Sequence, residues 1–126
     1  MLEASGLMKR LAEAPGVIVT EPMGYTDFMS LVFDCRYALT DSGGIQEETT
    51  YLGIPCLTLR ENTERPITVT QGTNRLVRAE TVQQHLETIL VGKWPKGTVP
   101  PLWDGKTASR VARSLKAAAQ GARIAR

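Results

Sequence analysis

The stretch YALTDSGGIQEETTYLGIP, residues 37–55, decides the fold. It runs from an apolar, strand-like beginning through the Gly43-Gly44 bend into a helical pattern, which a Gly-x-Pro sequence ends. A second apolar run, CLTL at residues 56–59, follows at once. Two buried strands joined by a helix predict a parallel βαβ unit, because a parallel pair of strands needs a crossover connection. We therefore predict an α/β fold around this stretch.

The flanking sequence continues the alternation of helices and strands. Apolar residues at helical spacing predict further helices, and short apolar runs predict further strands. The expected order is a helix at 7–14, a strand at 17–19, a helix around 28–33, the elements of 37–59, a polar loop at 60–74, a strand at 75–77, a helix at 80–90, a connector at 92–105 and a helix at 106–125. This order predicts a mainly parallel sheet of about four short strands with helices on both faces.

Length and composition limit the classes of function. The chain has 126 residues, room for one modest domain, so we expect residues 1–126 to form a single domain. It is 42% hydrophobic, yet no apolar run approaches the roughly 18 residues that indicate a membrane span. The net charge of +2 is too small to indicate nucleic-acid binding. The basic residues after Asp104 predict a solvated, positive helix face, with anion binding as the alternative.

Cysteine usage and the N-terminal residues bear on location and cofactors. Cys35 and Cys56 lie in apolar surroundings, and their spacing is unlike that of a metal site. The first 16 residues lack the apolar core of a signal peptide. We therefore expect a cytoplasmic protein with reduced thiols, without a metal or a cofactor.

The segment Ser42, Gly43 and Gly44, here called the glycine turn, is the first candidate site. A strand that runs through it into a helix places unpaired N–H groups and the positive end of the helix dipole at the carboxyl edge of the sheet. The glycines let the backbone approach a phosphate, and Ser42 can cap the helix or donate to a phosphate oxygen. The alternative interpretation is a plain serine N-cap on a tight turn.

Two adjacent glutamates follow the glycine turn. Glu48 comes four residues after Gly44, on the same helix face and about 6 Å further along the axis. A carboxylate beside a phosphate would be repelled unless it bound a neutral hydroxyl group of the same ligand, and one carboxylate can accept from both hydroxyls of a ribose. Glu47 points about 100° away and is expected to be structural or solvated.

Two further residues have competing interpretations. Arg65, in the loop LRENTERP at residues 59–66, can fork onto a phosphate or form a surface ion pair with a neighbouring glutamate. Phe28 follows a Pro-containing turn and can pack against a flat base, although its spacing favours a place in the core.

Several motifs together carry a family resemblance. They are EPMGYTDFMSLV at residues 21–32, ALTDSGGIQEE at 38–48, LGIPCLTLRENTERP at 52–66 and QGTNRLV at 71–77, with a weaker WDGKTASRV at 103–111. In this order and spacing they resemble the non-hydrolysing UDP-N-acetylglucosamine 2-epimerases. The resemblance implies a partial Rossmann-like domain, half of a C-terminal domain of the GT-B type. Departures from the family pattern are Ile67, where an acidic residue is usual, and Arg78, where glycine is usual.

The resemblance also implies ligands and residue roles. UDP or UDP-GlcNAc is the expected ligand, with its pyrophosphate at the glycine turn and its ribose at Glu48. Phe28 is expected near the uracil, and Arg65 at the pyrophosphate or the sugar. The family interconverts UDP-GlcNAc and UDP-ManNAc by eliminating UDP across C1 and C2 of the sugar and adding it back after the proton returns on the opposite face.

The family's acid and base groups belong to segments that this sequence does not match. Its only histidine, His85, fits no catalytic position and is expected to have a surface or packing role. The chain looks like the last third of a family member, so we expect no catalytic residue here and no turnover by the chain alone. The alternatives are a non-catalytic nucleotide-sugar-binding or assembly module, part of a split enzyme, or a piece of a related glycosyltransferase.

A partial domain of this kind would leave one sheet edge bare. In the usual strand order, two strands would lie between residues 17–19 and residues 37–40. Bare parallel edges invite pairing, so either these two segments pair directly or another chain covers the edge. We expect direct pairing, with self-association as a homo-oligomer as well.

Overall fold

The computed structural model describes residues 6–124, with only the backbone described for 121–124. The chain separates into two compact units, Met1–Phe33 and Asp34–Arg126. Each unit is treated separately below. A single domain over residues 1–126 stays a prediction.

The first unit holds helix α1, Leu7–Glu13, and most of helix α2, Tyr25–Asp34, both close to the expected positions. The strand expected at 17–19 is absent, because residues 17–24 form neither helix nor strand. Ile18 is 87% exposed. The expected pairing with residues 37–40 is therefore wrong. β-branched residues suit a pleated surface, but they do not themselves provide a neighbouring strand.

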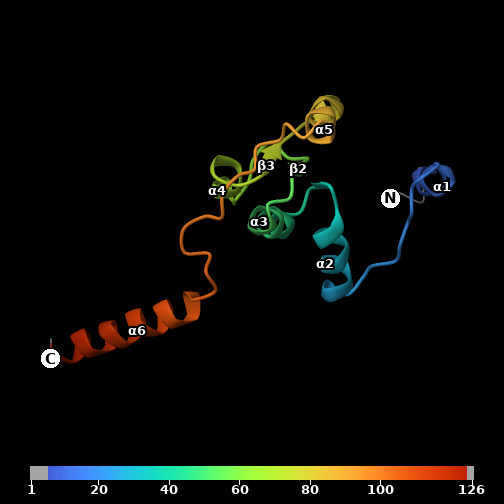
Figure 1. Cartoon of the computed structure of the whole chain (residues 1–126). Helices are drawn as coiled ribbons and strands as arrows, with labels where there is room; N and C mark the ends of the chain where they lie inside the picture. Colours follow the sequence, from blue (N-terminus) through green and yellow to red (C-terminus); the bar gives the residue numbers. More distant parts are fainter. Residues whose placement is uncertain (1–5, 125–126) are drawn as a thin grey trace. The chain divides into compact units, whose positions relative to one another are not determined.

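The second unit contains a three-stranded parallel sheet in the order β1-β2-β3, of which β2 and β3 are labelled in Figure 1. Its strands are β1, Ala38–Thr40; β2, Cys56–Thr58; and β3, Asn74–Leu76. Leu57 lies opposite Leu39 in β1 and opposite Arg75 in β3. The α/β class and the parallel sheet are confirmed, with three strands instead of about four.

Helices cover both faces of the central strand β2. Helix α3, Gly43–Leu52, runs from the glycine turn back to β2, as predicted. After β3, the turn η1, Ala79–Thr81, leads into helix α5, Val82–Leu90. Leu57 packs with Val77 and with Ile89 of α5, whereas Thr58 on the opposite face bonds Asn74 in a polar layer that continues to α3.

The segment expected to be a polar loop, residues 60–74, contains a short helix. Helix α4, Pro66–Thr70, begins with proline, whose fixed φ suits the first helical position. Gly72 follows α4 two residues after its end. A Cβ added to Gly72 would lie 2.3 Å from Thr50 Oγ1 and 2.6 Å from the Thr68 carbonyl oxygen. Only glycine fits this contact between α3 and α4.

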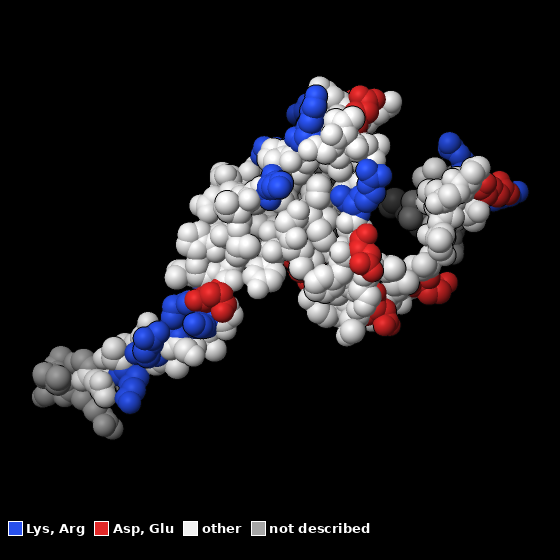
Figure 2. Space-filling view, viewed as in Figure 1, with Lys and Arg blue, Asp and Glu red and all other residues white. Residues whose placement is uncertain are grey.

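Helix α6, Thr107–Ile124, follows the proline-containing connector. Arg110 anchors its first turns by donating to both carboxylate oxygens of Asp104, at 2.9 and 3.0 Å. Lysine and arginine side chains follow one another along α6 (Figure 2), and Leu115 is 66% exposed. Within residues 6–124, no helix is long and apolar enough to cross a membrane.

Candidate functional site

The glycine turn joins β1 to α3. Ser42 has an extended backbone (φ −79°, ψ 135°) and is the N-cap residue of α3, as predicted. Its hydroxyl forms no capping bond, however, and its main-chain N–H donates to the Thr40 hydroxyl at 3.0 Å. Ser42 and Gly44 are exposed, and Gly43 is half-buried. Because the first amides of a helix have no intrahelical acceptor, the turn offers N–H groups and a hydroxyl to an anion.

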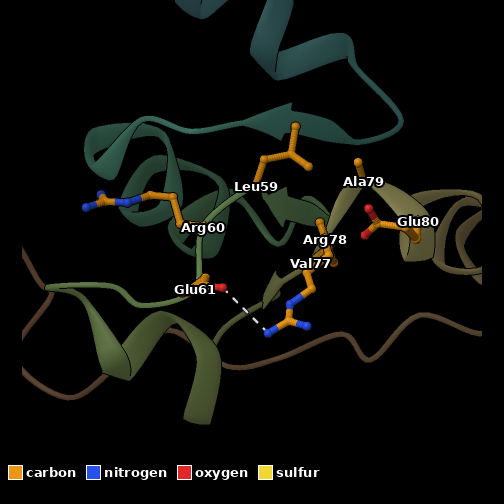
Figure 3. A pocket seen from close by; sticks show the side chains of 7 residues that line it. All are labelled: Leu59, Arg60, Glu61, Val77, Arg78, Ala79 and Glu80. Atoms are coloured by element: carbon orange, nitrogen blue, oxygen red, sulfur yellow. Dashed lines mark ion pairs between the residues drawn. The ribbon is translucent and has the colours of Figure 1, made fainter.

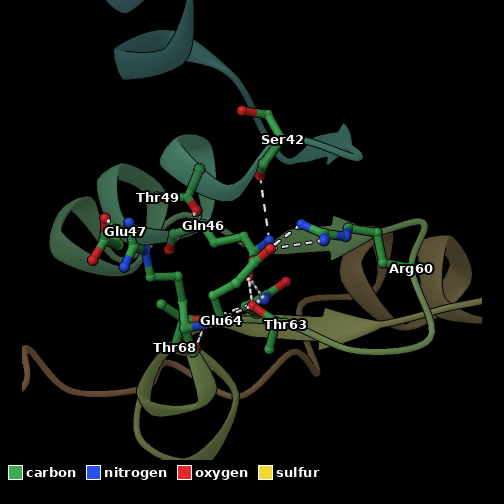
Figure 4. Close-up of polar contacts among 10 residues, drawn as sticks. Ser42, Gln46, Glu47, Thr49, Arg60, Thr63, Glu64 and Thr68 are labelled. Atoms are coloured by element: carbon green, nitrogen blue, oxygen red, sulfur yellow. Dashed lines mark hydrogen bonds and ion pairs between the residues drawn. The ribbon is translucent and has the colours of Figure 1, made fainter.

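A buried glutamine supports this turn from below (Figure 4). Gln46, in the first turns of α3, is fully buried, and its Nε2 donates to the Ser42 carbonyl oxygen at 3.3 Å. Its Oε1 accepts from Thr63 Oγ1 at 2.6 Å and from Asn74 Nδ2 at 3.0 Å. Gln46 therefore fixes the turn to the loop after β2 and to strand β3.

Asn74 extends the same network to the sheet and to α4. It is fully buried, and its Oδ1 accepts from Thr58 Oγ1 at 2.7 Å. Its Nδ2 also donates to Thr68 Oγ1 at 3.1 Å, and that hydroxyl donates to the Arg65 carbonyl oxygen at 2.8 Å. We call this set, Gln46, Thr58, Thr63, Thr68 and Asn74, the Gln46–Asn74 network. Its residues were missed as parts of the site, although Thr63 and Asn74 lie in motifs that carry the family resemblance.

Arg65 lies beside α3 and forms an ion pair. Its Nε is 3.2 Å from Oε2 of Glu47, and the two side chains are 47% and 40% exposed. The main-chain N–H of Arg65 donates to Thr63 Oγ1 at 2.9 Å, which ties this residue to the Gln46–Asn74 network. The structure therefore has the ion-pair arrangement for Arg65 and the structural role expected for Glu47. An exposed ion pair contributes little free energy, so Arg65 can exchange Glu47 for a phosphate.

A second ion pair lies close to the glycine turn. Arg60 donates to both carboxylate oxygens of Glu64, at 3.1 and 2.9 Å. A Cβ added to Gly43 would lie 3.9 Å from Glu64 Oε2, so this carboxylate borders the turn. The bonds from Arg60 lower the pKa of Glu64. The carboxylate stays negative, and Arg60 compensates the repulsion that it would exert on a phosphate.

The other predicted site residues are Glu48 and Phe28. Glu48 is half-buried on α3, one helical turn beyond Gly44. Phe28 lies on α2 in the first unit and is 38% exposed, so it is not a core residue within that unit. The second unit thus brings together the glycine turn, Glu48 and Arg65, while Phe28 belongs to the other unit.

A shallow hollow of about 290 Å³ lies at the carboxyl ends of β2 and β3 (Figure 3). It is lined by Leu59, Arg60, Glu61, Val77, Arg78, Ala79 and Glu80. The Arg78 guanidinium points toward Glu61, with the paired nitrogen and oxygen 3.5 Å apart. Positive and negative side chains alternate around the hollow, so its walls favour neither sign of charge.

The histidine and the two cysteines lie outside the glycine turn and its neighbours. The ring of His85 meets Trp94 edge to face, with centroids 5.9 Å apart, which is the expected packing role. Cys35 and Cys56 are free thiols, and burial raises the pKa of both. Among the described residues, no three His, Cys, Asp or Glu side chains gather as a metal site would require.

Comparison with known proteins assigns the family. The family described as UDP-N-acetylglucosamine 2-epimerase matches residues 3–116. The UDP-N-acetylglucosamine 2-epimerase of Methanocaldococcus jannaschii is 39% identical over 116 residues, which are 90% of this chain and 31% of the relative. A Pseudomonas aeruginosa protein named UDP-2,3-diacetamido-2,3-dideoxy-D-glucuronate 2-epimerase is 36% identical over 112 residues, 87% of this chain and 31% of its own. The chain thus spans about a third of the length of these relatives.

Solved structures agree with this assignment. The Methanocaldococcus jannaschii UDP-GlcNAc 2-epimerase in complex with UDP-GlcNAc and UDP superposes with a TM-score of 0.76 at 39% identity, over 91% of this chain and 32% of the other. The S. aureus MnaA–UDP co-structure gives a TM-score of 0.79 at 27% identity, over 93% of this chain and 33% of the other. The predicted relationship and fold are confirmed: this chain belongs to the UDP-N-acetylglucosamine 2-epimerase family.

Proposed function

We propose that this chain binds UDP and forms the nucleotide-holding part of a UDP-N-acetylglucosamine 2-epimerase. The observation that supports this most is the glycine turn, where Ser42 leaves its hydroxyl uncommitted to capping and the first amides of α3 lie at the surface. Ser42, Gly43 and Gly44 hold the pyrophosphate through these donors. The relatives whose structures contain UDP or UDP-GlcNAc support the same ligand for this chain.

In this proposal Glu48 binds the ribose. It is half-buried on the same helix as the glycine turn and about 6 Å further along the axis. A partly buried carboxylate is a strong acceptor for two neighbouring hydroxyl groups, because hydrogen bonds to a charged group are stronger than neutral ones. The uracil contact expected of Phe28, which lies in the first unit, stays a prediction.

Calorimetry with UDP and with pyrophosphate tests whether the glycine turn binds the pyrophosphate and Glu48 binds the ribose. Glu48→Ala removes the ribose contact and no contact with the pyrophosphate, so we expect it to weaken UDP binding by about tenfold or more and to leave pyrophosphate binding nearly unchanged. Glu61→Ala is the control, because it removes the same charge from a residue that pairs with Arg78 away from the turn. Equal losses for UDP and pyrophosphate in Glu48→Ala would contradict the ribose role.

Arg65 binds the pyrophosphate or the sugar once it leaves Glu47. A substitution that removes the Arg65–Glu47 ion pair from the free protein should therefore tighten ligand binding. Glu47→Gln tightens pyrophosphate binding by up to about fivefold, since an exposed pair is worth at most about 1 kcal/mol. The variant Arg65→Gln, combined with Glu47→Gln, abolishes this gain. A gain that survives in the double variant would mean that Arg65 does not contact the ligand.

The chain alone does not epimerise its ligand in this proposal. Its only histidine packs against Trp94, and Glu47, Glu61 and Glu64 are held in ion pairs. The proton-transfer groups come from other parts of a longer protein or from a separate chain. The two relatives compared above are named for different UDP-sugars, so recognition of UDP is the part that we assign to this chain.

Proton exchange at C2 of the sugar tests this limit. UDP-GlcNAc incubated with the chain in D₂O keeps its C2 proton in the NMR spectrum. Incorporation of deuterium at C2 would show that the chain is catalytic by itself. Failure of UDP to bind would instead favour an assembly module without nucleotide affinity.

The reduced thiols of Cys35 and Cys56 agree with a cytoplasmic location, which we propose as well.

A further inference from the structure

A second hollow lies on the sheet edge opposite the glycine turn. It measures about 280 Å³, and Pro55, which directly precedes β2, is one of its walls. Arg36, two residues before β1, lies at the same edge. The glycine turn follows the carboxyl end of β1, so this hollow is separated from it by the length of the parallel sheet. No residue of the proposed UDP site lines it.

The hollow carries positive charge without a matching carboxylate. Arg36 and Lys96 line it, and no aspartate or glutamate does. Both cations are exposed, and neither takes part in an ion pair within the described part of the chain. Arg65 and Arg110, in contrast, each pair with a carboxylate. Two unpaired cations on one small concave surface attract an anion.

Two helix ends partly offset this charge. Helices α3 and α5 end next to Gly53 and Gly92, which also line the hollow. A helix C-terminus carries about half a negative charge. Its carbonyl groups are already occupied here, since the Gly53 N–H donates to the Thr50 carbonyl oxygen at 3.3 Å and the Gly92 N–H to that of Ile89 at 2.9 Å. Two full positive charges exceed two partial negative ones, so the hollow remains positive.

An immobilised indole ring provides an apolar wall. Trp94 lines the hollow, and its Nε1–H donates to the Thr73 carbonyl oxygen at 2.9 Å. The ring also contacts His85 edge to face, at an interplanar angle of 89°. Ile89, only 7% exposed, adds a further apolar surface to the lining. A flat, apolar group can stack here at little entropic cost, because the indole is already fixed.

We propose that this hollow binds a small organic anion, with its carboxylate or phosphate held by Arg36 and Lys96 and its flat apolar part against Trp94. Such a ligand uses each feature of the site: two donors for the anionic group and one rigid wall for the body. The volume suits a molecule the size of a substituted benzene ring. This site is independent of UDP, because it shares no residue with the glycine turn, Glu48 or Arg65.

Fluorescence titration of the full chain with phenyl phosphate tests the proposal. The background variant Trp103→Phe leaves Trp94 as the only tryptophan. Phenyl phosphate changes the Trp94 emission and binds more tightly than inorganic phosphate, which lacks the ring, or benzyl alcohol, which lacks the charge. Arg36→Gln and Lys96→Gln each weaken phenyl phosphate by about tenfold, as expected for the loss of a charge-assisted contact.

Controls separate this hollow from the nucleotide site and from general charge effects. Arg113→Gln, which removes an exposed cation from α6, leaves the titration unchanged. Saturating UDP also leaves it unchanged. The proposal is overturned if phenyl phosphate fails to perturb Trp94, if Arg36→Gln and Lys96→Gln bind as the parent does, or if UDP displaces the probe. Since Arg36 and Lys96 are exposed, circular dichroism of both variants should match that of the parent.

Discussion

Asn74 should be among the side chains whose loss destabilises the second unit most. In Asn74→Ala the Thr58 hydroxyl loses its acceptor at 2.7 Å and keeps only a weak contact with Cys56 Sγ at 3.8 Å. A buried donor without a partner costs about 1–3 kcal/mol. The two hydrogen bonds that Asn74 Nδ2 donates to Gln46 and to Thr68 are lost as well. Each loss costs about 0.5–1 kcal/mol, because both acceptor groups retain another partner. The sum is about 2–5 kcal/mol, a large part of the 5–15 kcal/mol typical of a domain.

A double-mutant cycle with Thr58→Val identifies the cause of this loss. Valine has nearly the shape of threonine and carries no hydroxyl, so Asn74→Ala in the Thr58→Val background leaves no unsatisfied donor. We expect the double variant to cost at least about 1 kcal/mol less than the sum of the single variants. Urea unfolding followed by circular dichroism measures all of these free energies.

A matched control and a refuting result complete this test. Thr70→Val removes an exposed hydroxyl that donates only to the Pro66 carbonyl oxygen within α4, at 3.2 Å, so it should change stability by less than about 0.5 kcal/mol. If Asn74→Ala cost less than about 1 kcal/mol, or if its effect were additive with Thr58→Val, the Gln46–Asn74 network would not stabilise the unit as described.

The other predictions concern a backbone contact and a carboxyl group. Gly72→Ala should unfold the second unit or destabilise it by more than about 2 kcal/mol, because its Cβ would meet the Thr68 carbonyl oxygen at 2.6 Å; urea unfolding equal to that of the parent would contradict this. Hydrogen bonds from Arg110 lower the pKa of Asp104 from 3.8 to about 2, so the contact that anchors α6 is present above pH 3.8 and is lost as the pH falls through about 2. A carboxyl NMR titration should show this midpoint and its rise in Arg110→Gln, whereas a midpoint near 3.8 in the parent would refute it.

The sequence predicted the elements around the glycine turn because their signals are local. A strand, two glycines, a helical pattern and a Gly-x-Pro end lie within residues 37–55, and each constrains the next. The failure at 17–19 has the opposite origin, since a strand needs a partner and the sequence of one segment does not contain it. Helix α4 was missed although Pro66 is a helix-start signal, because the surrounding residues 60–74 are polar and lack helical periodicity.

The site shows a similar division. The glycine turn and Glu48 follow from spacing along one helix, which the sequence gives directly. The partner of Arg65 does not, because both a phosphate and Glu47 satisfy a guanidinium, and only the folded loop places Glu47 within 3.2 Å. The burial of Gln46 is also unpredictable from the sequence, since a glutamine beside two glutamates suggests a solvated face.

The Gln46–Asn74 network gives a structural role to two of the motifs that carry the family resemblance. In TERP and GTN the threonine and the asparagine do not lie on an exposed binding surface; they bond Gln46, which in turn bonds the Ser42 carbonyl oxygen. Their role is therefore to set the distance between the glycine turn and the loop that carries Arg65. Substitutions of Thr63 and Asn74 should impair UDP binding through the position of the turn, so the losses for UDP and pyrophosphate should be alike. This pattern is the opposite of the one expected for Glu48→Ala, and it separates residues that position the turn from the residue that contacts the ribose.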